Sequence, residues 1–212
     1  MALTIALAKG RLAKFATKLF SKCGLDITQL EEDNRKLVVY DEKNDIRFVL
    51  VKPADVPVYV YRGVADIGIA GKDTLLEAGL PLYEMLDLRC GTCKICVAGY
   101  AEKQKERITS SITRVATKYP RIAKMYYDEK GEDIEIIKLN GSIELAPILD
   151  LSDVIVDIVE SGATIRENGL SVLEEVCDVS ARLVVNQVSL KTKTEQIQPL
   201  IKAMSKALEE MQ

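Results

Sequence analysis

Asp153-Val-Ile-Val-Asp157-Ile-Val-Glu160-Ser161-Gly162-Ala163-Thr164 is the stretch that indicates the class of fold. Its apolar, β-branched start predicts a buried strand over Val154–Ile158, and the small residues after it predict a tight turn that opens a helix. A strand that leads into a helix in this way is typical of α/β sheets. Small side chains let backbone N–H groups approach an anion, to which Ser161 and Thr164 add hydroxyl donors. An ordinary capped helix has the same pattern, so both interpretations stay open at this point.

Strand and helix patterns alternate on both sides of this stretch, which predicts parallel or mixed sheets. We expect the last two predicted strands to pair with each other. The other predicted strands are Leu3–Ala8, Leu37–Tyr40, Ile46–Val51, Ala65–Ala70, Leu82–Leu86, Lys94–Ala98, Thr113–Ala116, Ile134–Leu139, Ser171–Val176 and Ala181–Ser189, and the predicted helices are Arg11–Cys23, Pro53–Arg62, Asp73–Ala78, Lys118–Asp128, Ser142–Ile148 and Lys193–Met211.

Four of the predicted strands end in a small or polar loop that opens a helix, two in each half of the chain. Ligands of open α/β sheets bind beyond the carboxyl ends of strands, so two halves of this kind would line a cleft. We therefore expect two lobes, residues 1–89 with about 178–212 and residues 90–177. The four loops are Lys9-Gly10-Arg11, Gly71-Lys72-Asp73-Thr74, Asn140-Gly141-Ser142 and Ser161-Gly162-Ala163-Thr164.

Charged residues at three helix starts are further candidates for binding. Lys9 and Arg11 oppose the dipole of the helix they open, a cost that an anion bound between them would offset. They can equally be solvated surface charges. Asp73 and Glu144 can recognise donors on a base or a ribose, although the helix dipole alone also favours an acid at such positions.

The composition excludes several classes of function. Of 212 residues, 48% are hydrophobic and 29% charged, and the net charge of −3 argues against a nucleic-acid-binding protein. Because the chain contains no histidine, histidine can be neither a catalytic base nor a metal ligand in this protein. No apolar run approaches the length of a membrane helix, and the odd number of cysteines, without an export signal, predicts reduced thiols in the cytoplasm.

The cysteine series Cys90-Gly-Thr-Cys93-Lys-Ile-Cys96 invites a metal-site interpretation. If the last part of it is a strand, Cys93 and Cys96 point to opposite faces. A fourth ligand would have to be Cys23, Cys177 or a carboxylate, which the sequence does not place nearby. We therefore predict no metal held by the protein here, and keep a metal protein as a competing hypothesis.

Six ordered blocks between residue 3 and about 190 together resemble the short form of ATP phosphoribosyltransferase. This resemblance is more specific than any single loop. The blocks are Ala8-Lys-Gly-Arg-Leu12, Asp55-Val-Pro-Val-Tyr-Val60, Gly63-Val-Ala-Asp-Ile-Gly-Ile-Ala-Gly-Lys-Asp73, Arg114-Val-Ala-Thr-Lys-Tyr-Pro120, Leu139-Asn-Gly-Ser-Ile-Glu-Leu-Ala-Pro147 and Asp153 to Leu170.

The resemblance implies a two-lobed fold like that of type II periplasmic binding proteins, with mixed sheets and a cleft. It implies the first step of histidine biosynthesis, in which ATP and 5-phosphoribosyl 1-pyrophosphate give phosphoribosyl-ATP and pyrophosphate. Mg²⁺ would be carried by the substrates. The expected assembly is a homodimer within a hetero-oligomer that contains a regulatory subunit resembling histidyl-tRNA synthetase. A two-lobed small-molecule-binding module without catalysis is the alternative.

The same resemblance implies roles for individual residues. Glu160, Ser161, Gly162, Ala163 and Thr164 would hold the 5′-phosphate. Asp157 would bind the ribose hydroxyls, and Lys9 and Arg11 would act as catalytic cations near the pyrophosphate and the ATP phosphates. Gly10, Lys52, Asp73 and Glu144 would bind ATP.

Three positions depart from the usual pattern of the family. Lys52 stands where an arginine is usual, which puts a bidentate contact there in doubt. Arg62 replaces a common acid. Asp150 replaces a common glycine, which questions a close backbone approach at that point.

Overall fold

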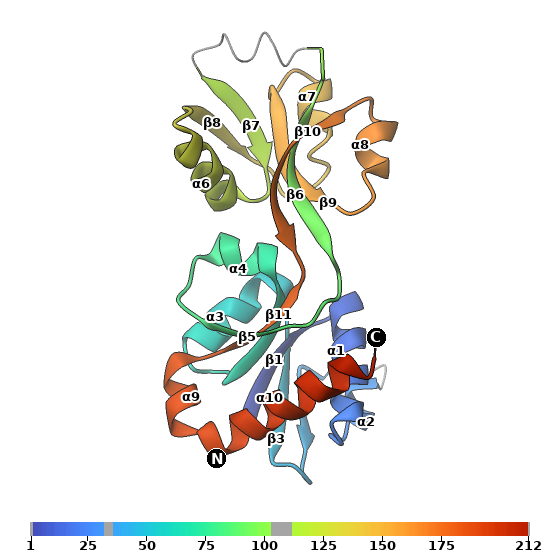
Figure 1. Ribbon diagram of the computed structural model, residues 1–212, viewed down its shortest axis with the longest axis vertical. Helices are drawn as coiled ribbons and strands as arrows, with labels where there is room; N and C mark the ends of the chain where they lie inside the picture. The colour runs from blue at the N-terminus through green and yellow to red at the C-terminus, as the bar shows by residue number, and fades with distance from the viewer. Residues whose placement is uncertain (1, 32–35, 103–111, 212) are drawn as a thin grey trace. The chain divides into compact units, whose positions relative to one another are not determined.

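The computed structural model describes residues 2–31, 36–102 and 112–211 (Figure 1). The chain divides into two compact units, which are unit 1 (Met1–Gly91 and Ser180–Gln212) and unit 2 (Thr92–Val179). The sequence places these borders at residues 89 and 178. None of the helices in the described part of the chain has the length and hydropathy to cross a membrane.

Unit 1 is built on a six-stranded mixed sheet in the order β2-β3-β1-β4-β11-β5. The three strands β3, β1 and β4 run parallel, and the others pair antiparallel with their neighbours. The strands are β1 (Leu3–Ala8), β2 (Val38–Asp41), β3 (Ile46–Val51), β4 (Ile67–Gly71), β5 (Tyr83–Asp87) and β11 (Ala181–Val185).

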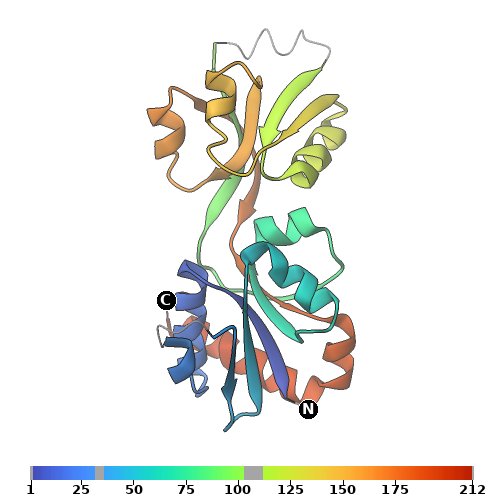
Figure 2. The same cartoon turned by 180° about the vertical axis from the view of Figure 1, so that it is seen from behind.

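Helices cover both faces of this sheet. Large apolar side chains of β1, β3 and β4 pack on one face against α1 (Arg11–Lys22) and the amphipathic α10 (Thr194–Glu209). On the other face, seen in Figure 2, small residues of the strands meet α3 (Val56–Tyr61) and α4 (Lys72–Ala78). A Cβ on Gly68 would lie 2.6 Å from a methyl of Val60, so the close approach of α3 requires glycine.

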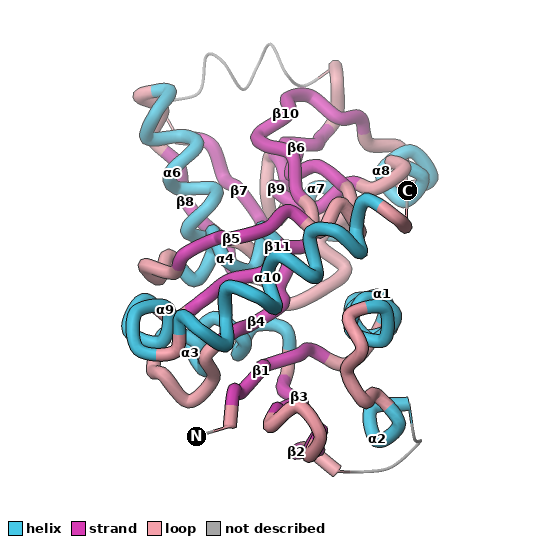
Figure 3. The backbone as a smooth tube through the Cα atoms, turned by 60° about the horizontal axis from the view of Figure 1, so that its bottom comes forward, coloured by secondary structure: helices cyan, strands magenta, loops and turns pink. Residues whose placement is uncertain are grey.

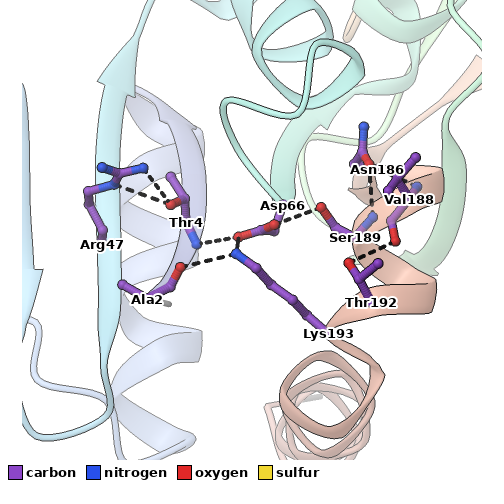
Figure 4. Close-up of polar contacts among 9 residues, drawn as sticks. All are labelled: Ala2, Thr4, Arg47, Asp66, Asn186, Val188, Ser189, Thr192 and Lys193. Atoms are coloured by element: carbon purple, nitrogen blue, oxygen red, sulfur yellow. Dashed lines mark hydrogen bonds and ion pairs between the residues drawn. The ribbon is translucent and has the colours of Figure 1, made fainter.

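The C-terminal segment belongs to unit 1 and is fastened there by a buried carboxylate (Figure 4). Asp66 accepts hydrogen bonds from the Thr4 N–H at 2.8 Å, the Ser189 hydroxyl at 2.6 Å and the Lys193 ammonium at 2.7 Å. Asn186 caps α9 (Gln187–Thr192) through its side-chain oxygen. As Figure 3 shows, α9 leads directly into α10, so these contacts hold both helices on the sheet.

Unit 2 is built on a five-stranded mixed sheet in the order β10-β6-β9-β7-β8. The strands β8, β7 and β9 are parallel, and β6 and β10 are antiparallel to their neighbours. The elements are β6 (Cys93–Gly99), β7 (Thr113–Thr117), α6 (Pro120–Lys130), β8 (Ile134–Lys138), α7 (Leu145–Ile148), β9 (Val154–Val159), α8 (Ala163–Glu167) and β10 (Ser171–Val179).

The two sheets repeat one arrangement, although the sequence shows no repeat. In each unit, three parallel strands stand in the order second, first, third, namely β3-β1-β4 and β8-β7-β9. Beside the third parallel strand of each set lies the strand with which the chain begins its segment of that unit after leaving the other unit, β11 in unit 1 and β6 in unit 2. The edge strand β5 or β10 follows it. The α/β fold with two mixed sheets is confirmed, and α4 and α8 take equivalent places after the third parallel strand.

Several predicted elements were wrong. The last two strands do not pair with each other, because β10 pairs with β6 and β11 lies between β4 and β5. β11 ends at Val185, because Asn186 caps a helix that the sequence did not predict. α6 begins at Pro120, since proline suits a first helical position. The short α2 (Thr28–Glu31) was also missed, and the predicted helix Pro53–Arg62 consists of a 3₁₀ helix, η1 (Pro53–Asp55), followed by α3.

Candidate functional site

The candidate residues of unit 1 gather at one edge of its sheet. Because β1, β3 and β4 are parallel, with Ala8 opposite Val51 and Leu7 opposite Ile69, their carboxyl ends meet at the same edge. Lys9, Lys52 and the α4 loop follow these three ends. We call the residues Lys9, Gly10, Arg11, Lys52 and Asp73 the unit 1 edge.

The loop after β1 is basic and needs its glycine. Gly10 has φ 116° and ψ −155°, a conformation that residues with a Cβ rarely adopt. Lys9 and Arg11 on either side of it are exposed, and the first turn of α1 contains no acidic residue. Two cations with no acid in that turn make this loop suited to an anion with several charges.

The other two members of the unit 1 edge differ in exposure and charge. Lys52 is exposed and precedes η1 with extended backbone, φ −70°. Asp73 is half-buried in the first turn of α4, and its carboxylate folds back over Gly71, where it occupies the space that a Cβ would need. The unit 1 edge thus offers one carboxylate beside three cations.

In unit 2 the small-residue loop Glu160–Thr164 follows β9, as predicted, and Gly162 lies at its centre. Gly162 is left-handed, with φ 71° and ψ 8°, and comes directly before α8. The Ala163 N–H donates to the Ser161 hydroxyl at 3.3 Å. α8 has only 5 residues, so the contribution of a helix dipole is small, and backbone N–H and hydroxyl groups are the donors that matter here.

Arg166 lies against this loop, which the sequence did not predict. Its Nη1 donates to the Ser161 carbonyl at 3.1 Å and lies 2.9 Å from the place where a Cβ of Gly162 would be. The signal was present as an arginine one helical turn after Gly162, but its contact depends on the left-handed backbone of that glycine.

Asp157 lies in β9, three residues before the loop, at the same carboxyl edge. It is half-buried, and its Oδ1 accepts the Ile158 N–H at 2.8 Å. The end of β7 lies alongside, since Thr117 is opposite Val156 and its hydroxyl donates to the Val156 carbonyl at 2.6 Å. β9 is thereby anchored to β7 next to Asp157.

Glu144 belongs to unit 2 and follows the end of β8, where it comes directly before α7. It is half-buried. Because β8, β7 and β9 are parallel, Glu144 lies beyond the same edge of the sheet as the Glu160–Thr164 loop. The candidates therefore form two groups, one at the carboxyl edge of each unit.

Arg114, the first residue of one of the six family blocks, is a structural residue. Its guanidinium forms an ion pair with Asp153 at 2.7 Å and donates to the Asp150 carbonyl at 2.9 Å. The hydrogen bond and the negative charge of Asp153 raise the pKa of Arg114. Asp150 has φ 55°, a left-handed conformation that explains why glycine suits this position and why aspartate is tolerated.

The cysteine series shows no sign of a metal site. Burial, and then the charge of Asp87, raise the pKa of Cys90 to about 11, which disfavours the thiolate that a metal needs. Cys93 and Cys96 lie on β6, three residues apart, and so face opposite sides of the sheet. Within the described ranges, no group of three or more Cys, Asp or Glu residues is arranged to hold a metal ion.

Comparisons with known proteins identify the family of the chain. The family model described as ATP phosphoribosyltransferase matches residues 52–206, more than half of the chain. The chain is 56% identical over 200 residues to an ATP phosphoribosyltransferase of Ruminiclostridium cellulolyticum, covering 94% of each protein. It is 54% identical over 209 residues to that of Lachnospira eligens, covering 98% of this chain and 97% of the relative.

A solved structure supports the same assignment. It is the ATP phosphoribosyl transferase (HisG:HisZ) complex from Thermotoga maritima, one chain of which matches with a TM-score of 0.86 and 36% identity. The match covers 98% of this chain and 99% of that one. The chain belongs to the ATP phosphoribosyltransferase family.

Proposed function

We propose that this chain transfers the phosphoribosyl group of 5-phosphoribosyl 1-pyrophosphate to N1 of ATP, the first step of histidine biosynthesis. The observation that carries the proposal is the similarity to ATP phosphoribosyltransferases over nearly the whole chain, with 56% identity to one of them. The two groups of candidate residues supply the features that this reaction needs, which are an anion-binding loop for the donor and a basic edge for the phosphates.

Unit 2 would bind the ribosyl donor. The backbone N–H groups of Ser161–Thr164 and the hydroxyls of Ser161 and Thr164 would donate to the 5′-phosphate, while Asp157 accepts from the ribose hydroxyls. Charge-assisted hydrogen bonds of this kind contribute about 1.5–3 kcal/mol each. Glu160 lies between Asp157 and Ser161 in the sequence and would face the ribose.

The unit 1 edge would act on the phosphates of both substrates. In the reaction the N1 lone pair of adenine attacks C1 of the ribose, and the bond from C1 to the pyrophosphate oxygen breaks. The electron pair leaves with pyrophosphate, so Lys9 and Arg11 would stabilise the negative charge that develops there. Because adenine N1 is itself the nucleophile, the chemistry needs alignment of the substrates and no histidine base.

ATP would be oriented by the remaining candidates. Gly10 leaves room for a phosphate beside the backbone of the β1 loop, and Lys52 adds a positive charge at the same edge. The carboxylates of Asp73 and Glu144 would accept hydrogen bonds from donors on the adenine or the ribose.

Mg²⁺ would enter with the substrates. Magnesium keeps water and phosphate oxygens as ligands and rarely uses an all-protein site, so bound pyrophosphate is a sufficient carrier. The candidate residues fit such a complex, since the cations of the unit 1 edge would neutralise the charge that one divalent ion leaves. The ion would make pyrophosphate a better leaving group.

We propose that the chain works as a homodimer within a hetero-oligomer. The matching structure from Thermotoga maritima is a complex of two kinds of chain, HisG and HisZ. By the family resemblance, the second subunit would be a regulatory protein like histidyl-tRNA synthetase. The pathway and the five cysteines, which form no disulfide in the described structure, agree with the cytoplasm.

The test is a product assay with the purified chain and its cognate regulatory subunit. Supplied with ATP, 5-phosphoribosyl 1-pyrophosphate and Mg²⁺, the complex should form phosphoribosyl-ATP and pyrophosphate. No product from a correctly assembled complex would refute the proposal. Calorimetric binding of one small solute without turnover would instead favour a binding module.

A further inference from the structure

The proposed 5′-phosphate loop carries an unfavourable charge of its own. Glu160–Thr164 contains no basic residue, and Glu160 and Asp157 are acidic. A phosphate monoester has a charge of about −1.5 to −2 at neutral pH. The five-residue helix α8 offers little compensation. A positive side chain close to the loop would therefore stabilise a phosphate bound here.

Arg166 is such a side chain, and it is held in place. Its Nη1 donates to the Ser161 carbonyl at 3.1 Å, and its Cζ lies 3.9 Å from the Cβ position of Gly162. The Arg166 N–H also donates to the Gly162 carbonyl at 3.1 Å, which closes the first turn of α8. The backbone and the side chain of one residue thus both contact the centre of the loop.

The guanidinium keeps donors for a ligand. Arginine has five N–H donors in a planar fork that suits phosphate oxygens, and the Ser161 carbonyl takes one of them. The Arg166 side chain is exposed, so a substrate can reach it. In the equivalent loop of unit 1, a carboxylate, Asp73, covers Gly71 instead, and the cation of that loop, Lys72, pairs with Glu84. Of these two loops, the unit 2 loop is therefore the one with a cation over its glycine, and the fold does not dictate that charge.

We propose that Arg166 is a further binding residue for the 5′-phosphate of the ribosyl donor. The inference rests on the proposed function, because it assigns the phosphate to the Glu160–Thr164 loop. The hydrogen bond to the Ser161 carbonyl positions the guanidinium, and its charge and remaining donors act on the phosphate oxygens.

The experiment uses Arg166→Gln, Arg166→Lys and the control Lys124→Gln in the complex with the regulatory subunit. Lys124 is an exposed cation of the same unit, on α6, paired with Asp128. For each protein one measures KM for both substrates, and inhibition by ribose 5-phosphate and by pyrophosphate. Ribose 5-phosphate carries the 5′-phosphate alone, so it separates that phosphate from the pyrophosphate end.

R166Q should raise KM for the ribosyl donor and the inhibition constant of ribose 5-phosphate by about 10- to 100-fold. KM for ATP and inhibition by pyrophosphate should stay within about threefold. R166K should recover part of the loss, because it keeps the charge without the fork. K124Q should behave like the wild type.

An active R166Q with unchanged donor KM and unchanged inhibition by ribose 5-phosphate would overturn the inference. An equal loss in all four constants would also overturn it, because that result describes a damaged fold. If R166Q does not fold, R166K decides by the same two constants. A wild-type complex that binds ribose 5-phosphate in a calorimeter but makes no product would refute the proposed function and not the role of Arg166.

Discussion

Gly71 and Gly162 occupy equivalent places in the two units, yet the side chains that lie over them have opposite charge. Each comes directly before the helix that follows the third parallel strand of its sheet. Gly71 has φ −67° and lies under the carboxylate of Asp73, whereas Gly162 has φ 71° and lies under the guanidinium of Arg166. The fold places a glycine before a helix at equivalent positions of both units, and the two loops differ in backbone conformation and in the charge of the side chain over the glycine.

Substitution of Gly162 by valine should give the largest effect of all, a loss of affinity for the ribosyl donor. A β-branched side chain is strained at φ 71°, and its Cβ would lie 2.9 Å from Arg166 Nη1. KM for the ribosyl donor should rise by about 100-fold or more, by loss of two or more hydrogen bonds to the phosphate. Circular dichroism should show an intact fold, and an unchanged KM would mean that the loop does not bind the donor.

Arg11→Ala should weaken the stabilisation of pyrophosphate at the unit 1 edge. Arg11 opens α1 beside Gly10, at a helix start without an acid. If it stabilises the leaving pyrophosphate, kcat should fall by about 10- to 100-fold, somewhat less than the loss of a buried oxyanion donor. Lys18→Ala, which removes an exposed cation farther along the same helix, should leave kcat unchanged. Equal effects of the two substitutions would contradict a catalytic role for Arg11.

Asp73→Asn should affect the binding of ATP and not that of the ribosyl donor, which would distinguish the loop at Gly71 from the loop at Gly162. The substitution keeps the size of the side chain over Gly71 and removes its charge. KM for ATP should rise by about 10- to 100-fold, the loss of one charge-assisted hydrogen bond, while KM for the ribosyl donor changes little. Steady-state kinetics with each substrate varied in turn would check this. A rise confined to the donor KM would show that the two loops have been assigned the wrong way round.

Asp66→Asn should affect neither substrate. Its carboxylate is buried before β4 and holds Thr4, Ser189 and Lys193. Loss of the charged partner should lower stability by about 1–3 kcal/mol and the melting temperature by about 5 °C. Both KM values should remain those of the wild type. A changed KM with an unchanged melting temperature would show that Asp66 acts in the site.

The strand and turn at Val154–Thr164 were readable from the sequence because their signals are local, namely β-branched residues followed by small ones. The partners of β10 and β11 were not readable. Only Ser180 separates these strands, and their pairing with β6 and β4 is decided by contacts more than 70 residues away in the sequence. Local pattern carries no information about such partners.

The same limit applies to single side chains of the site. Arg114 belongs to one of the family blocks, but Asp153 and two carbonyls occupy its guanidinium. Arg166 was visible as an arginine one helical turn after Gly162, but its contact with the loop depends on the left-handed φ of that glycine and could not be predicted. The family blocks gave the candidate residues, and the three-dimensional partners distinguish the structural arginine from the one available to a ligand.

Hydrogen–deuterium exchange on the assembled complex, with one substrate added at a time, tests most directly whether the Glu160–Thr164 loop binds the ribosyl donor and the start of α4 binds ATP. The ribosyl donor with Mg²⁺ should slow exchange of the backbone amides of residues 161–164 and leave residues 72–75 unchanged. ATP should slow exchange at residues 72–75 and leave residues 161–164 unchanged. Donor-dependent protection of residues 72–75 without protection of residues 161–164 would contradict the assignment.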